Sequence, residues 1–226
     1  DMLRTYFERC DEDTSVYFAD KQIWACGQSY RKLQGRYPVI FLSFKDAHQT
    51  NWEDMYKSLC FTLREEYIRH VDILMNERLN DYDRRYFTDI TNGQGEITDY
   101  QFALGKLSSM LAACYGSKTI IIIDEYDTPI QQGYLHHYYD EVVGFMRNLF
   151  SGGFKDNPHP YGFMTGILRI AKESIFSGLN NLKINSILDR KYSSYFGFTS
   201  DEVSAMADYY GVPEKYEELR QWYDGY

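Results

Sequence analysis

The amino-acid sequence predicts an α/β fold with a mostly parallel β-sheet flanked by helices. Two short apolar runs indicate buried strands: residues 38–44 read Pro-Val-Ile-Phe-Leu-Ser-Phe, and residues 120–123 are four isoleucines. Near-continuous apolar strands are typical of parallel sheets, in which both faces are covered. Amphipathic segments alternate with these runs, and such alternation favours helices layered on a parallel sheet.

The elements of the first half follow from spacing and capping signals. Apolar side chains of residues 2–10 recur at helical spacing, as in the tail of a helix that started earlier. After the strand at 38–44, Thr50 and Glu53 have the spacing of a capping box. They open a long helix whose apolar face runs from Trp52 to Tyr67. Residues 76–96 are polar, contain two glycines, and are interpreted as a connection or an insertion.

The second half continues the alternation of helices and strands. Thr98 and Gln101 fit a capping box, and Gly116 supplies the stop of that helix. Further elements are a helix around 139–150 ended by Gly152 and Gly153, a strand at 161–167, and a short strand at 194–198.

Two helices are expected at the end of the chain. Thr199 and Glu202 fit a capping box, and Gly211 ends the helix that they begin. A second short helix, around residues 214–222, follows Pro213.

Composition excludes several classes of protein. The chain has 226 residues, 44% of them apolar, so it can build a globular core. Its net charge of −9 argues against a broad surface for duplex nucleic acid, which needs clustered cations. Its four cysteines have no Cys-x-x-Cys spacing, and three fall on apolar helix positions, so we expect buried free thiols rather than zinc ligands or disulfides. With no apolar run near 18 residues and no secretory start, a cytoplasmic protein without membrane spans is expected.

The most informative stretch is 119–130, Thr-Ile-Ile-Ile-Ile-Asp-Glu-Tyr-Asp-Thr-Pro-Ile. Asp124 and Glu125 follow the apolar strand directly, and ligands of open α/β sheets bind outside such strand ends. One carboxylate can hold Mg²⁺ through water while its neighbour activates an attacking water. This is the Walker B pattern, with Asp124 on the metal side and Glu125 as the base. The alternative is a strand that simply meets solvent with two charges.

Asp127 is a third acid in the same turn. It is a candidate metal ligand beside Asp124, although an Asx-type turn before Pro129 is the favoured alternative. A phosphate loop of the form Gly-x-x-x-x-Gly-Lys-Ser/Thr is absent from the sequence. The nearest imitation, at residues 116–119, lies between a helix and a strand, which is the wrong context.

A second polar segment, 165–182, follows the strand expected beside Asp124. Thr165 ends that strand and could hold the attacking water or contact the γ-phosphate. Arg169 is a candidate for stabilising the charge that develops on the phosphate, and Lys172 for binding the nucleotide. The alternatives are a turn threonine and two solvated cations at the start of a helix.

These stretches, together with Tyr-Phe-Gly-Phe-Thr at 195–199 and Glu202-Val203, resemble the bacterial AAA-ATPase-like family. The resemblance covers essentially the whole chain. It implies a P-loop NTPase-like fold of the AAA type, with residues 1–198 as the core and 199–226 as the start of a helical lid. In this family a strand and a loop ending in Gly-Lys-Thr come before a helix similar to residues 2–8. We therefore expect the phosphate loop upstream of Asp1.

The resemblance also implies a function. It predicts binding and hydrolysis of ATP with Mg²⁺, coupled to an effector. Members of the family commonly carry a PD-(D/E)XK nuclease-like domain after the ATPase domain, so nucleic acid is expected as a partner only through such a domain. The resemblance does not decide the oligomeric state, and an oligomer is possible because ATPase sites often use a neighbour's cation.

Two rival functions remain open at this point. The first is an interaction module that keeps the fold without hydrolysis, which the missing phosphate loop motivates. The second and weaker rival is a metal-dependent nuclease that uses Asp124, Glu125 and Asp127.

Overall fold

The structure is a computed structural model, and it describes residues 1–155, 161–167, 175, 182–186, 189, 191–192, 195 and 197–223. The chain divides into two compact units, Asp1–Asn180 and Asn181–Tyr226. The first unit contains, in order, α1 (Met2–Phe7), η1 (Thr14–Tyr17), α2 (Gln22–Ala25), α3 (Gln28–Arg31), β1 (Val39–Ser43), α4 (Trp52–Arg69), η2 (Val71–Met75), α5 (Asp81–Asn92), α6 (Ile97–Tyr115), β2 (Ile120–Asp124), α7 (Thr128–Leu135), α8 (Tyr139–Phe154) and β3 (Gly162–Met164).

The described part of the first unit has one sheet of three parallel strands in the order β1–β2–β3. In its register Ser43 pairs with Asp124, and Ile123 pairs with Met164. Because the strands are parallel, their carboxyl ends meet at one edge of the sheet. The predicted α/β class is confirmed, with a parallel sheet of three strands in the described part of this unit.

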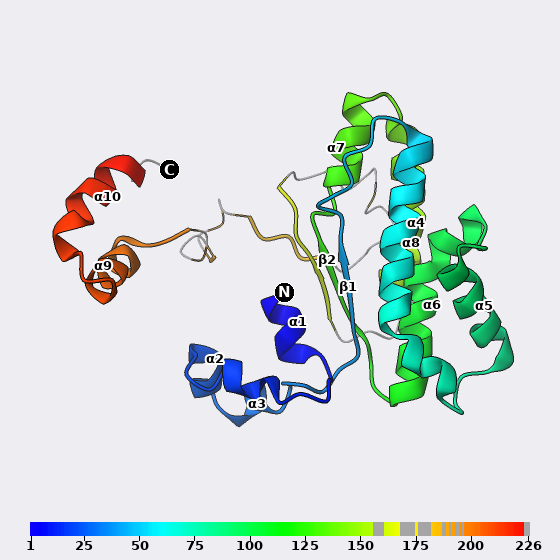
Figure 1. The fold of residues 1–226 in the computed structure, drawn as a ribbon, viewed down its shortest axis with the longest axis horizontal. Coiled ribbons are helices and arrows are strands. Elements are labelled where there is room, and N and C mark those ends of the chain that lie inside the picture. The colour runs from blue at the N-terminus through cyan, green and yellow to red at the C-terminus, as the bar shows by residue number, and fades with distance from the viewer. Residues whose placement is uncertain are drawn as a thin grey trace. The chain divides into compact units, whose positions relative to one another are not determined.

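Helices cover both faces of the sheet (Figure 1), with α4, α6 and α8 on one side and α1 on the other. Alternate side chains of a strand point to opposite faces. Val39, Ile120 and Ile122 form a buried cluster against Phe7 of α1 and Phe163 of β3. Ile40, Leu42, Ile121 and Ile123 occupy the alternate positions and are also buried. The apolar runs of the sequence thus correspond to strands buried on both faces.

Several predicted boundaries need correction. α4 is capped by Asn51, whose side chain accepts the amide of Asp54, and not by a Thr50–Glu53 box. The capping box of α6 pairs Glu96 with Asp99 rather than Thr98 with Gln101. In both helices a residue with a suitable side chain lies close to the predicted cap, and sequence spacing does not choose between such neighbours.

Two predictions about whole segments were wrong. Residues 76–96, interpreted as a connection or insertion, contain the helix α5, which buries Phe87 and Ile90. The expected stop at Gly152 and Gly153 is also wrong, because α8 continues through both to Phe154. α6 and α8 pack together at these glycines: a Cβ placed on Gly105 of α6 would lie 2.3 Å from the carbonyl oxygen of Gly152. The glycines allow two helix backbones to approach, and they do not end a helix.

This close approach gives a stability prediction for Gly105→Ala. The added methyl meets backbone, which cannot move as a side-chain tip can, so overpacking is expected to lower the free energy of unfolding by about 1–3 kcal/mol. Gly144→Ala in α8 is the matched control, because nothing lies within 4 Å of its Cβ position. It should stabilise the helix by up to about 1 kcal/mol. Urea denaturation of both variants measures the difference, and equal stability of the two would contradict the proposed contact.

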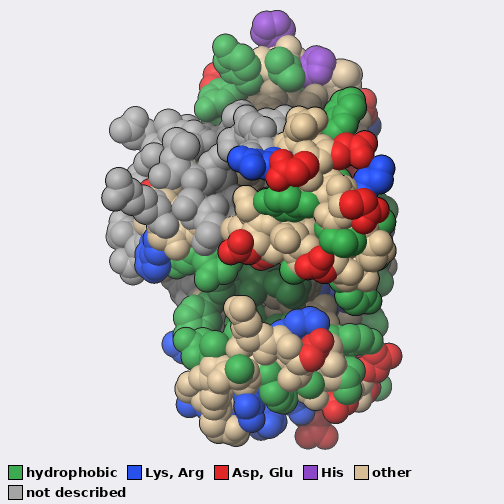
Figure 2. Space-filling view, turned by 90° about the vertical axis from the view of Figure 1, so that its left-hand side faces the viewer, with side chains coloured by type: hydrophobic (Ala, Val, Ile, Leu, Met, Phe, Trp, Pro, Cys, Tyr) green, Lys and Arg blue, Asp and Glu red, His purple; other side chains and the backbone are tan. Residues whose placement is uncertain are grey.

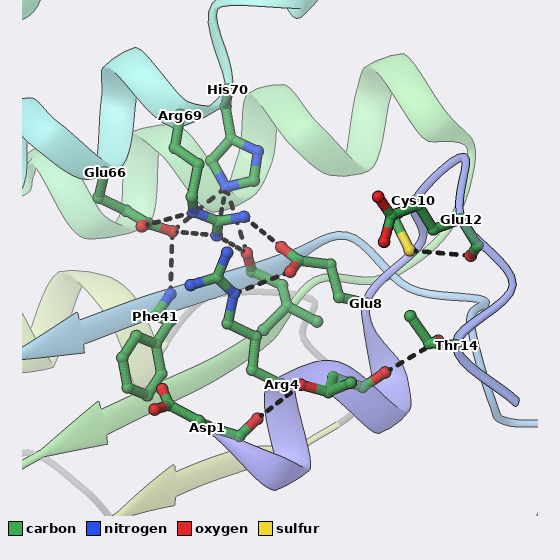
Figure 3. Close-up of polar contacts among 12 residues, drawn as sticks. Asp1, Arg4, Glu8, Cys10, Glu12, Thr14, Phe41, Glu66, Arg69 and His70 are labelled. Carbon is green, nitrogen blue, oxygen red and sulfur yellow. Dashed lines mark hydrogen bonds and ion pairs between the residues drawn. The ribbon is translucent and has the colours of Figure 1, made fainter. Parts of the chain in front are cut away.

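A charged network closes the outer edge of β1 (Figure 3). Glu66 of α4 accepts the backbone amide of Phe41 at 2.9 Å, and Arg69 donates to the carbonyl oxygen of Val39. Arg69 also binds Glu66 through two nitrogens, at 2.6 and 2.9 Å, and contacts Glu8 beyond the end of α1. These side chains take the place of a neighbouring strand, which protects an edge that would otherwise expose unpaired backbone groups.

All four cysteines are free. Cys60 and Cys114 are buried as expected, and burial raises the pKa of the Cys60 thiol to about 11. Cys10 and Cys26 are exposed, because Cys10 lies beyond the end of α1 and Cys26 follows the short helix α2. Among the described helices, none combines the length and apolar character that crossing a bilayer would require.

The second unit contains α9 (Ser200–Tyr209), η4 (Pro213–Lys215) and α10 (Tyr216–Tyr223). The predicted capping box of α9 is confirmed, since Thr199 accepts the amide of Glu202 and the Glu202 carboxylate accepts that of Thr199. Gly211 has a φ of +71°, as expected for the residue that ends this helix. The short strand predicted at 194–198 falls largely outside the described residues.

Candidate functional site

The candidate site lies where the parallel strands end. Asp124 is the last residue of β2, and the next residue along β3 after Met164 is Thr165. The backbone amide of Thr165 donates to the carbonyl oxygen of Ile123 at 2.9 Å, which extends the pairing of β3 with β2 by one residue. The sheet register therefore brings Asp124 and Thr165 together although they are forty-one residues apart.

The Asp124 carboxylate and the Thr165 hydroxyl are in direct contact. The hydroxyl of Thr165 donates to Oδ1 of Asp124. Asp124 is half-buried and Thr165 is exposed, so the pair faces solvent from a sheet whose core is dry. A half-buried carboxylate at this position keeps free lone pairs for a water or a cation.

Glu125 lies at the turn that leads from β2 into α7. Its φ of +52° places it in the left-handed region, which a residue with a side chain rarely adopts. Its Oε2 accepts a hydrogen bond from the Thr128 hydroxyl at 3.3 Å, and its carbonyl oxygen accepts the Thr128 amide. Such backbone strain concentrates at functional sites, where the surrounding structure enforces it. The turn holds a half-buried carboxylate directly beside Asp124.

Asp127 has a different environment from the two preceding acids. Its side chain is only 1% exposed, and Oδ2 accepts hydrogen bonds from the Gln131 side chain at 2.8 Å and the Ile167 amide at 3.0 Å. The sequence suggested either a metal ligand or an Asx-type turn. The observed contacts connect the turn with the segment after β3, and they favour a positioning role.

The loop after β1 forms another border of this region. The amide of Phe44 donates to the carbonyl oxygen of Asp124 at 3.0 Å. Further on, Nδ1 of His48 lies 3.4 Å from the side-chain nitrogen of Gln132 in α7, and the Tyr138 hydroxyl donates to the Gln49 carbonyl oxygen at 2.6 Å. The sequence had suggested no role for this loop, because these contacts join residues eighty or more positions apart.

Two candidate residues, Arg169 and Lys172, lie outside the described residues. Gln131 is a site neighbour that sequence analysis missed. Its spacing of four residues from Asp127 would have been the signal had the helix α7 been expected there, because side chains four apart on a helix are neighbours.

The carboxylates at this edge of the sheet suit Mg²⁺ better than they suit a metal ion whose ligands all come from the protein. In the part of the chain that the structure describes, no group of three or more His, Cys, Asp or Glu could hold a metal ion. Mg²⁺ keeps several waters and needs only one or two carboxylates besides its substrate phosphates. Asp124, with Glu125 next to it, provides that donor set.

The charges on the surface are mixed. On the face in Figure 2, Lys and Arg side chains are interspersed with Asp and Glu.

Comparison with known proteins gives one family and one relative. Residues 1–176 match the AAA-ATPase_like family, which is described as a predicted AAA-ATPase. A protein of Azotobacter chroococcum mcd 1, described as "Uncharacterized protein in vnfD 5'region", is 33% identical over 128 residues. That alignment covers 54% of this chain and 24% of the relative, so the chain spans about a quarter of the relative's length. No solved structure matches the chain.

Proposed function

The chain belongs to the AAA-ATPase-like family, and from this premise we propose that it binds ATP with Mg²⁺ and hydrolyses it at the carboxyl end of β2. The observation that carries the proposal is the contact between the Thr165 hydroxyl and Asp124, with Glu125 as the adjacent half-buried carboxylate. The fold expected with this function is the P-loop NTPase-like fold, in which the β2 motif is a Walker B strand. The observed parallel sheet with two acids at its carboxyl edge supports this assignment.

Each residue of the site has a distinct proposed role. Asp124 holds Mg²⁺ through water, and the bound ion neutralises charge on the β- and γ-phosphates. Glu125 accepts the proton of the attacking water, and Thr165 orients that water or contacts the γ-phosphate. Arg169 and Lys172 supply positive charge near the phosphates, a role that rests on the sequence alone.

We further propose that the nucleotide state is coupled to an effector. Residues 199–226, which include α9 and α10, form the start of a lid in this proposal, and lid movements of this kind close ATPase sites during turnover. A nuclease-like domain in the same polypeptide is the proposed effector. The chain spans about a quarter of its relative's length, and the coupling is proposed for a protein that carries such a further domain.

Nucleotide binding is the first test. A fluorescent ATP analogue is titrated, with and without Mg²⁺, into this chain and into a version extended upstream of Asp1 by about 40 residues, enough for the expected strand and phosphate loop. We expect Mg²⁺-dependent binding in the extended version. Failure of both to bind would overturn the proposed function and favour the interaction module.

The proposed role of Asp124 gives a specific prediction. Asp124→Asn keeps the acceptor for the Thr165 hydroxyl but removes the charge that holds Mg²⁺. In the version that binds nucleotide, the affinity gained by adding Mg²⁺ should fall by about 10- to 100-fold. Asp72→Asn, an exposed aspartate in η2, is the matched control and should leave the affinity unchanged. An equal Mg²⁺ effect in the two variants would exclude Asp124 as the metal-side carboxylate.

A further inference from the structure

The buried carboxylate of Asp127 is the feature of the site that the proposed chemistry leaves unused. It is the most buried of the three acids in the turn, at 1% exposure. An ionised carboxylate only accepts hydrogen bonds, and one buried without donors would be costly. Among the described residues, donors to Oδ2 come from different parts of the fold, and they include the Gln131 side chain in α7 and the Ile167 backbone amide beyond β3.

The bond to Ile167 continues a series of contacts between the two segments. The Thr165 amide donates to the Ile123 carbonyl oxygen at 2.9 Å, and the Tyr126 amide donates to the Thr165 carbonyl oxygen at 3.2 Å. β3 ends at Met164 and its pairing with β2 extends by one residue to Thr165, so the chain leaves the sheet ladder beyond Thr165. Asp127 then supplies, with its side chain, the acceptor that a strand neighbour would have supplied with its backbone.

Gly166 shows how closely the two segments approach. A Cβ at this residue would lie 2.5 Å from Oδ1 of Asp127 and 2.8 Å from a ring carbon of Tyr126. A real Cβ does not tolerate such distances, so any larger residue would displace the segment. The carboxylate is thus enclosed by its own chain, with Gly166 against Oδ1 and the Gln131 and Ile167 donors on Oδ2.

We propose that Asp127 is a positioning residue: through the Ile167 amide it holds the Thr165–Ile167 segment so that the Thr165 hydroxyl stays on Asp124. It acts through Thr165 and does not ligate the metal. The consequence for turnover rests on the proposed function, whereas the position of the segment does not. Together with the backbone hydrogen bonds of Thr165, this carboxylate fixes the relative placement of the ends of β2 and β3, on which a two-strand site depends.

The first measurement is hydrogen exchange of the Ile167 amide by NMR. Asp127→Ala removes the acceptor, and exchange should accelerate by about tenfold or more, as expected for losing a hydrogen bond to a charged group. Asp127→Asn keeps an acceptor and should restore most of the protection. Gln131→Ala removes a different donor to the same oxygen and should leave Ile167 protected. Unchanged exchange in Asp127→Ala would overturn the proposal.

The second measurement is turnover in the version that hydrolyses ATP. Asp127→Ala should lower kcat by about tenfold or more and keep KM within about twofold. The variant loses the correct position of Thr165, which assists the reaction rather than the binding of the nucleotide. Asp127→Asn should recover most of kcat. Gly166→Ala keeps the carboxyl group of Asp127 but presses a methyl group against its Oδ1, so it should displace the same segment and reproduce both effects if Asp127→Ala does not fold.

The two failures are distinguishable. Absence of turnover in the unaltered protein overturns the proposed function, and amide exchange then decides the positioning role by itself. Turnover that is unchanged in a folded Asp127→Ala protein with a rapidly exchanging Ile167 amide overturns the positioning role and leaves the proposed function standing.

Discussion

Glu125→Gln is expected to lower the rate of ATP hydrolysis by about 10²- to 10⁴-fold, the usual contribution of a positioned general base. Glutamine has the same shape as glutamate but cannot accept the proton of the attacking water. It retains an oxygen for the hydrogen bond from the Thr128 hydroxyl. Because glutamine has a Cβ just as glutamate does, the energetic cost of the left-handed backbone at this position is the same for both residues. Nucleotide affinity and stability should therefore change little, while turnover falls.

The measurement is steady-state hydrolysis beside nucleotide titration, both in the version that binds ATP. Glu141→Gln provides the matched control, since Glu141 is an exposed glutamate of α8. It should retain full turnover. If Glu125→Gln hydrolyses ATP at the unaltered rate, Glu125 is not the base, whatever its position beside Asp124.

The sequence was sufficient to predict the parallel sheet and the position of Asp124 and Glu125 at its carboxyl edge. The apolar runs that became β1 and β2 are too short and too uniform for amphipathic helices, and burial on both faces explains that composition. Asp124 and Glu125 could be placed at the carboxyl edge because they follow the β2 run directly. Thr165 was placed beside them by the same reasoning, from the position of the next strand.

The missed features depend on contacts that spacing does not encode. α5 buries few apolar side chains among many polar ones, so its sequence resembled a connection. Gly152 and Gly153 resembled a helix stop, but they lie inside α8 because α6 passes close by at Gly105. One partner of Asp127 is a backbone amide forty residues away, and a backbone amide leaves no signature in the sequence.

The charged network behind β1 carries the second large prediction. Glu66 is 6% exposed, and its pKa is the outcome of opposing influences. Burial acts most strongly and favours the neutral acid, but hydrogen bonds from His70 and Arg69, with the charge of Arg69, together hold the pKa of Glu66 below its ordinary value of 4.5. The ionised carboxylate therefore stabilises the fold.

Glu66→Gln should lower the free energy of unfolding by about 3–5 kcal/mol near neutral pH, as expected when a buried ion pair is broken by removing the charge of one partner. The amide can still accept from Phe41, but it places an N–H group against Arg69 and removes the charge that Arg69 neutralises. Glu65→Gln makes the same change at the adjacent, exposed position and should stay within about 0.5 kcal/mol of the unaltered protein.

The pH dependence separates lost charge from altered packing. A carboxyl group whose pKa is lower in the folded state contributes stability that is present above its unfolded pKa and lost as the pH falls through its folded pKa. The gap between Glu66→Gln and the unaltered protein should therefore be widest above pH 4.5 and narrow below it. Urea denaturation across this range measures the gap. A constant gap would mean that shape, and not the ion pair of Glu66 with Arg69, accounts for the loss.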